Sequence, residues 1–206
     1  MFVRPLHSVV WNLFLAVIPV ILSLIIFAGV RRQRRSGHVQ WLLWGPMLIV
    51  WLAFLPNTCY LITEWRHYLD DLLRSPNTYF QSRHSHSEML QLMLGSAFYI
   101  CYSGSGLICF YLSIYPLDML FNPPWYVRPF FFFLISLGVY LGLVDRFNSW
   151  QVFHLRAIVH AAHQAVERPV LLLIMSGFSL VLWFFYSLFG LTMEGVRSRY
   201  RKLRPA

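Results

Sequence analysis

The sequence from Val9 to Val30 reads VVWNLFLAVIPVILSLIIFAGV and contains no charged residue. About 20 apolar residues are enough for a helix to cross the hydrocarbon core of a bilayer, which is about 30 Å thick. Backbone groups in that core must be paired within the segment, so a helix is expected. The stretch exceeds the roughly 7–15 residues of a signal-peptide core. We therefore expect a retained membrane-spanning helix.

Four further apolar stretches follow the first one along the chain. They cover residues 39–62, 89–115, 126–144 and 170–193. Hydrophobic residues make up 58% of the chain and charged residues 12%, whereas soluble domains carry about 25% charged residues. The sequence predicts an all-α, polytopic membrane bundle of about five transmembrane helices, organised as one integral membrane domain over residues 1–206.

Basic residues cluster beside the spans and set the expected orientation. Four arginines lie within residues 31–35, after the first span, and five more Lys or Arg lie within residues 197–204. Such segments favour the cytoplasmic side of a membrane. We therefore expect a multi-pass protein of the inner (plasma) membrane, with its N-terminus outside and its C-terminus in the cytoplasm. Topology explains the net charge of +9, so we expect contacts with anionic lipids and no nucleic-acid binding.

The second apolar stretch contains two prolines, Pro46 and Pro56. Proline removes a backbone donor and clashes with the preceding turn, so the helix kinks or ends there. In one interpretation the helix is broken inside the membrane and Asn57 faces a protein-lined cavity. In the interpretation that we favour, the helix ends at the interface with Asn57 in water, because proline is common at helix boundaries.

Small residues mark the fourth apolar stretch. Gly138 and Gly142 form a Gly-x-x-x-Gly pattern, which lets helix backbones approach closely. Packing inside the monomer is the interpretation that we favour, and homodimerisation through the two glycines is the alternative.

The segment 151–168 lies between the fourth and fifth stretches and has apolar residues at spacings of three and four. This pattern predicts an amphipathic helix in the outer interface, with Trp150 as an aromatic anchor. A soluble-style helix packed over the bundle is the alternative.

The expected outer loop, residues 63–88, holds the weak candidates for chemistry. Glu64 and His67 lie three residues apart and could act as a general base pair on a substrate. His67, His84 and His86 could ligate a metal, although their spacing is not diagnostic. We favour the interpretation that Glu64 and His67 are a solvated loop pair, because exposed ion pairs are ordinary and weak. We therefore predict no catalytic residue, no metal site and no cofactor, and the three cysteines indicate no disulfide framework.

The candidate binding site combines two segments that end spans on the same expected side. Asn57 and Tyr60 belong to the first segment, and Arg146, Asn148 and Trp150 to the second. The second segment could bind a lipid phosphate or carboxylate. It could equally form a structural clamp on residues of the first, which needs no ligand. Since unpaired polar groups near a bilayer are costly, we expect one polar cluster at the extracytoplasmic face.

The same two segments resemble a known family. Residues 54–64, FLPNTCYLITE, are similar to a Leu-Pro-Asn-x-x-Tyr motif that ends in Thr and an acid. Residues 138–142, GVYLG, followed by residues 146–150, RFNSW, are similar to a second motif. Both resemble the bacterial membrane proteins grouped as domain of unknown function 1361, from the second span to the fifth. The resemblance implies a small polytopic membrane protein and supplies no activity. Glu64 and Gln151 stand where that pattern more often has Asp.

Three functions fit the sequence. We favour a non-enzymatic accessory or assembly protein that contacts membrane lipids and other membrane proteins or a second copy of itself. The alternative is a membrane-embedded enzyme acting on a lipid or lipid-linked substrate, with Glu64 and His67 near Arg146. A small transporter ranks third. A deep polar pocket around Asn57 would favour the enzyme, a polar path through the bilayer the transporter, and a closed apolar bundle the accessory role.

Overall fold

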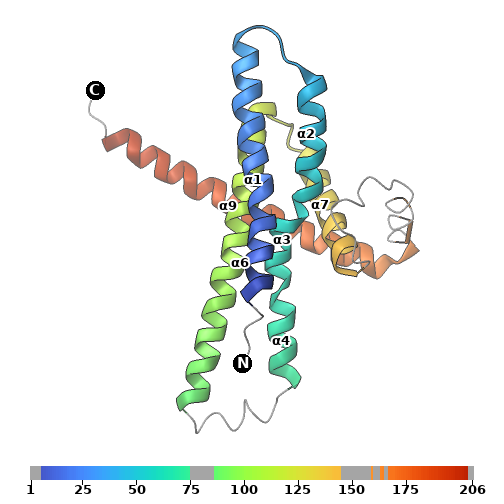
Figure 1. Ribbon diagram of the computed structural model, residues 1–206, viewed down its shortest axis with the longest axis vertical. Helices are drawn as coiled ribbons and strands as arrows, with labels where there is room; N and C mark the ends of the chain where they lie inside the picture. The colour runs from blue at the N-terminus through green and yellow to red at the C-terminus, as the bar shows by residue number, and fades with distance from the viewer. Residues whose placement is uncertain (1–5, 75–85, 145–158, 160–162, 165–166, 204–206) are drawn as a thin grey trace. The chain divides into compact units, whose positions relative to one another are not determined.

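The computed structural model describes residues 6–74, 86–144, 159, 163–164 and 167–203 (Figure 1). Regular structure in these residues is helical throughout, which confirms the predicted all-α fold. The chain divides into two compact units, Met1–Pro116 and Leu117–Ala206. The helices are α1 (Leu6–Arg35), α2 (Trp41–Phe54), α3 (Pro56–Thr63), α4 (Trp65–Arg74), α6 (His86–Phe121), α7 (Val127–Val144) and α9 (Pro169–Leu203).

Four helical segments among the described residues are long and apolar enough to cross a membrane. They are His7–Arg35, Trp41–Asp70, Met89–Phe121 and Pro169–Gly195. The remaining predicted span, residues 126–144, coincides with α7, whose apolar part Val127–Gly142 is shorter than the about 20 residues that usually cross a bilayer. Length and composition thus support four of the five predicted spans, and the crossing by α7 stays a prediction.

The helical path does not end at Pro56. Leu55 keeps helical dihedrals, φ −57° and ψ −40°, and its N–H donates to the Trp51 carbonyl at 3.0 Å. Pro56 takes the first position of α3, where its fixed φ suits the helix and its missing N–H would be unpaired anyway. Asn57 is only 6% exposed. The favoured expectation that Asn57 lies in water is therefore wrong, although α2 does end next to Pro56, at Phe54.

Helices α1 and α2 form an antiparallel hairpin (Figure 1). Gly37, at φ +82°, provides the left-handed residue of the turn. The indole of Trp44 lies over Gly29, where an added Cβ would overlap the ring, so a larger residue would have to displace the indole. The Gln33 side-chain oxygen accepts from Trp44 Nε1 at 2.8 Å and from the backbone N–H of Gln40 at 2.9 Å. These bonds close the hairpin at its turn.

Hydrogen bonds also join α6 to α2 and α3. Trp51 Nε1 donates to the carbonyl and to the hydroxyl oxygen of Ser113, both at 3.2 Å. Ser103 Oγ donates to the Leu61 carbonyl at 3.1 Å. An added Cβ at Gly106 would lie 2.7 Å from Leu61 Cβ, so the two backbones approach closely there. Close approach at small residues and bonds between helices are the usual means of holding membrane helices together.

The unit Leu117–Ala206 is built on the pairing of α7 with α9. Ser136 Oγ of α7 donates to the Met175 carbonyl of α9 at 2.8 Å, and both residues are buried. Phe132 of α7 packs against the ring of Tyr186 at 5.6 Å between centroids. Gly138 and Gly142 lie half-buried in α7, and their role in packing or in self-association stays a prediction.

Candidate functional site

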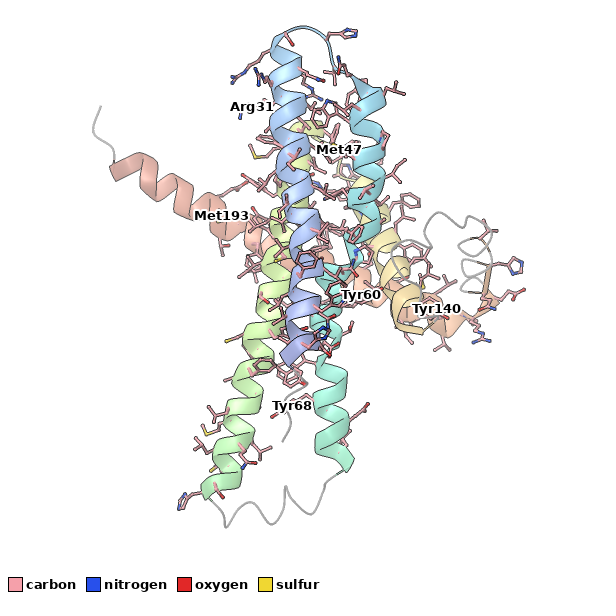
Figure 2. The ribbon with its side chains drawn as sticks, in the orientation of Figure 1. Arg31, Met47, Tyr60, Tyr68, Tyr140 and Met193 are labelled. Atoms are coloured by element: carbon pink, nitrogen blue, oxygen red, sulfur yellow. The ribbon has the colours of Figure 1, made fainter. Side chains whose placement is uncertain are left out.

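The polar residues predicted from the first motif lie together on α3 and its C-terminal cap. We call Asn57, Thr58, Tyr60 and Glu64 the α3 polar segment. Thr58 is fully buried, Glu64 is 8% exposed, and Tyr60, labelled in Figure 2, is half-buried. Spacings of four and three residues place Asn57, Leu61 and Glu64 on one helix face. The segment predicted to meet water at the outer face is therefore enclosed by protein in this structure.

Two helices enclose this segment. Leu61 packs in a buried cluster with Val9 and Ala16 of α1 and with Tyr102 of α6. One turn further along α6, the close approach at Gly106 brings this helix against Leu61 and the Thr58 carbonyl oxygen. The α3 polar segment thus lies at the meeting point of α1, α3 and α6.

The hydroxyl groups of α3 bond to their own helix. Thr58 Oγ1 donates to the Leu55 carbonyl at 2.8 Å, and the Thr58 N–H reaches the same oxygen at 3.1 Å. Thr63 Oγ1 donates to the Tyr60 carbonyl at 2.8 Å. Such bonds satisfy the hydroxyls and often accompany helix bending. These two threonines therefore stabilise the local path after Pro56.

An aromatic cluster continues from this segment along α4 and α6. The Tyr68 hydroxyl donates to the Leu92 carbonyl at 3.1 Å and lies 2.8 Å from Ser96 Oγ. Its ring stacks on Tyr99 at 4.9 Å and meets Trp65 edge-on at 5.7 Å. Figure 2 shows Tyr68 between the two helices. Sequence analysis missed this contact, although Tyr68 follows Glu64 by four residues and so shares its helix face.

The candidates for chemistry are distributed over three helices of the described residues. Glu64 is buried at the end of α3, His67 lies in α4, and His86 is exposed at the start of α6. His84 lies outside the described residues. Within the part of the chain that the structure describes, no group of three or more His, Cys, Asp or Glu side chains could hold a metal ion.

The first part of the second motif, residues 138–142, lies in α7. Its second part lies outside the described residues, because Arg146, Asn148 and Trp150 fall in 145–158. Its convergence with the α3 polar segment stays a prediction. Most of the expected interfacial helix, 151–168, lies outside them as well. Its described part includes an exposed pair in which His163 Nδ1 is 3.3 Å from Glu167 Oε1, at the spacing of one helical turn.

A second polar cluster, which sequence analysis did not predict, joins three helices of the unit Leu117–Ala206. Asp118 Oδ2 at the end of α6 accepts from Arg128 Nη2 of α7 at 3.0 Å and from the Tyr186 hydroxyl of α9 at 2.9 Å. Asn122 ends α6 with a left-handed φ of 46°, a conformation that Asn tolerates. The sequence does contain a signal for this cluster, because the acid Asp118 and the base Arg128 lie ten residues apart on either side of two adjacent prolines. We call Asp118, Arg128 and Tyr186 the Asp118 clamp.

Several helices are long and apolar enough to span a membrane, and polar side chains form hydrogen bonds from one helix to another. These features define a multi-pass helical membrane protein. The chain belongs to the family described as Protein of unknown function (DUF1361), whose model matches residues 11–185. The match covers most of the chain and confirms the resemblance found in its two motifs. Comparisons with curated proteins and with solved structures give no match.

Proposed function

We propose that this protein is a non-enzymatic integral membrane protein that serves as an accessory or assembly partner of a larger membrane complex. The observation that supports this role is the enclosure of Asn57, Thr58 and Glu64 by the protein's own helices. A site for a small molecule needs a concave opening with polar groups directed into it. Enclosed polar groups instead give a bundle one defined packing arrangement.

The proposal includes an orientation in the plasma (inner) membrane. The last turn of α1 carries arginines, including Arg32, Arg34 and Arg35, and their side chains are exposed. Because basic residues beside a span favour the cytoplasm, we place this end of α1 and the basic end of α9 inside, and the N-terminus outside.

Affinity purification tests the accessory role. The full chain, tagged at its C-terminus, is extracted in mild detergent, and both the proteins and the lipids that co-purify are identified by mass spectrometry. We expect a defined membrane protein in constant ratio to the tagged chain, and the same protein with the Glu64→Gln variant. Recovery of the chain with lipid alone, from membranes that hold it at its natural level, would refute an accessory role.

The buried carboxyl of Glu64 supports a second candidate, an enzyme acting on a lipid-linked substrate. A carboxyl group in a low-dielectric site is a common general acid or base. In that case Glu64→Gln would cause a lipid-linked molecule to accumulate in the membrane, detectable by lipid mass spectrometry. Glu167→Gln, at an exposed position, is the matched control and should leave the lipid profile unchanged.

A further inference from the structure

The end of α1 that leads into the α1–α2 turn carries four arginines with exposed side chains. We call them the arginine turn, and they are Arg31, Arg32, Arg34 and Arg35. The first 63 residues of the chain contain no Asp or Glu. The first acid, Glu64, caps the far end of α3, about 35 Å along the helical path from Trp41. The chain around the arginine turn therefore supplies no negative side chain of its own.

Two of these arginines stand side by side on the outer face of α1. Gln33 points toward α2, where its side-chain oxygen accepts from Trp44 Nε1. Arg31 and Arg35 each lie two residues from Gln33, on the opposite face, and are four residues apart. Like charges at this spacing repel each other and destabilise a helix. An anion held between the two guanidinium groups would remove the repulsion, and paired guanidinium donors suit a phosphate group.

The arginine turn is also held in place by contacts that its charge does not require. The guanidinium carbon of Arg31 lies over the ring of Phe27, 5.6 Å from its centroid, which is a cation–π geometry. Ser36 Oγ donates to the Gln33 carbonyl at 2.9 Å, and the Gly37 N–H donates to the Arg34 carbonyl at 3.3 Å. The rule that orients membrane helices explains the number of basic residues but not these contacts. A cation that is already positioned loses less freedom when it binds a ligand.

The position of Arg31 along α1 matches the level of lipid head groups. Trp11 is 53% exposed on the same helix, and tryptophan is enriched at the boundary between the hydrocarbon core and water. Arg31 follows Trp11 by 20 residues, or about 30 Å of helix, which is the thickness of that core. With Trp11 at one boundary, Arg31 reaches the phosphate groups at the other. Figure 2 shows Arg31 at the end of α1 that leads into the turn.

Exposed apolar residues follow directly after the turn. Trp41, Leu42 and Leu43 form the first turn of α2, and Leu42 is 94% exposed. Because α1 and α2 are antiparallel, these residues lie at the same end of the hairpin as the arginine turn (Figure 1). A ligand that covers both surfaces needs an anionic head and a hydrocarbon chain. Free phosphate or a nucleic acid would cover the arginines alone.

We propose that the arginine turn is a binding site for an anionic phospholipid, in which Arg31 and Arg35 hold the phosphate group and Trp41 and Leu42 contact the acyl chains. This assignment differs from the general attraction of a basic segment to a charged surface, because it names two side chains and a fixed geometry. It depends neither on the accessory role nor on the orientation proposed above.

Lipid titration of the full chain in a neutral detergent tests the site. Phosphatidylglycerol is the probe, phosphatidylcholine is the zwitterionic control, and the rise in unfolding temperature with lipid concentration gives the Kd. The double variant Arg31→Gln/Arg35→Gln should raise the Kd for phosphatidylglycerol about thirtyfold, since each basic residue near a membrane surface contributes about fivefold in affinity. Arg199→Gln/Arg201→Gln removes the same charge from the end of α9 and is the matched control, which should change the Kd far less.

A second variant tests the geometry without changing any charge. Phe27→Leu removes the ring beneath Arg31, so the affinity for phosphatidylglycerol should fall about threefold. Phe14→Leu, at an exposed position near the other end of α1, is the matched control and should leave the affinity unchanged.

Four results would overturn the proposal. The first is an equal loss of affinity in the two double variants, and the second is an unchanged affinity in Phe27→Leu, because both mean that charge alone attracts the lipid. The third is displacement of the lipid by inorganic phosphate, or equal binding of phosphatidylcholine. The fourth is an Arg31→Gln/Arg35→Gln variant that keeps its lipid affinity but loses a co-purifying protein, which would assign the arginine turn to a protein partner.

Discussion

Gly104 and Gly106 stand two positions apart on α6 and have opposite surroundings. A methyl group at Gly106 would lie 2.7 Å from the Thr58 carbonyl oxygen and from Leu61 Cβ, whereas one at Gly104 meets open space. Gly106→Ala should therefore lower the free energy of unfolding by about 1–3 kcal/mol through overpacking. Gly104→Ala should leave it unchanged or raise it by up to about 1 kcal/mol, because alanine favours a helix more than glycine does. Thermal unfolding in detergent measures both variants, and equal behaviour would show that α6 does not approach α3 closely at Gly106.

Tyr68 offers a second comparison between single residues. Tyr68→Phe keeps the buried ring but removes the hydroxyl that bonds to Leu92 and lies beside Ser96. We expect a loss of about 1 kcal/mol of stability, the usual worth of a hydrogen bond. Tyr126→Phe, on an exposed ring, is the control. Chemical denaturation in mixed micelles gives the difference, and no loss for Tyr68→Phe would place its hydroxyl in water instead.

The candidate site was predictable from the sequence only in part. Asn57 and Glu64 were identified as polar residues at the end of an apolar stretch, but their burial depends on where α1 and α6 pack. The contact of Tyr68 with Ser96 joins residues 28 positions apart. Such a contact is set by the register of two helices, and a single sequence does not state that register.

The Asp118 clamp links three elements, α6, α7 and α9, through one carboxylate. Asp118→Asn and Arg128→Gln should each lower the unfolding temperature, because each leaves a polar partner without its charge-assisted bond. Since the Arg128 side chain is 38% exposed, solvent screening limits the expected loss to about 1 kcal/mol. The double variant should be little worse than either single one, because both changes remove the same interaction. Additive losses, measured by thermal unfolding, would mean that the two residues act independently.

Helix positions were predictable where length and apolar composition decide them. Residues 9–30 and 89–115 lie within α1 and α6, and residues 170–193 lie within α9. The helices run further than predicted, and α9 continues to Leu203. The bilayer limits only the length of the apolar segment, whereas the helix itself can continue into polar residues once its first turns have formed. The error at Pro56 has a physical cause. The same fixed φ suits a helix boundary and the first turn of a continuing helix, so proline alone does not distinguish them.

At the scale of the whole molecule, α7 decides on which side of the membrane the chain ends. Its 18 residues span about 27 Å, slightly less than the hydrocarbon core, and local thinning of the bilayer accommodates such a mismatch. If α7 crosses, five spans place the basic segment 31–35 and the basic tail on the same side. If α7 does not cross, four spans place them on opposite sides.

Basic residues at both ends favour the cytoplasm, so we predict that α7 crosses the membrane and that the tail lies inside. A reporter that fluoresces only in the cytoplasm should be active at the C-terminus. A reporter that is active only outside should work when inserted at Ser82, in the segment that precedes α6. Insertion at Gly37, in the turn after α1, provides the matched cytoplasmic control. A tail that reports outside while Gly37 reports inside would mean four crossings, and α7 would then lie on the membrane without spanning it. A chain of this composition cannot leave both basic segments outside without opposing the charge bias that orients its helices during insertion.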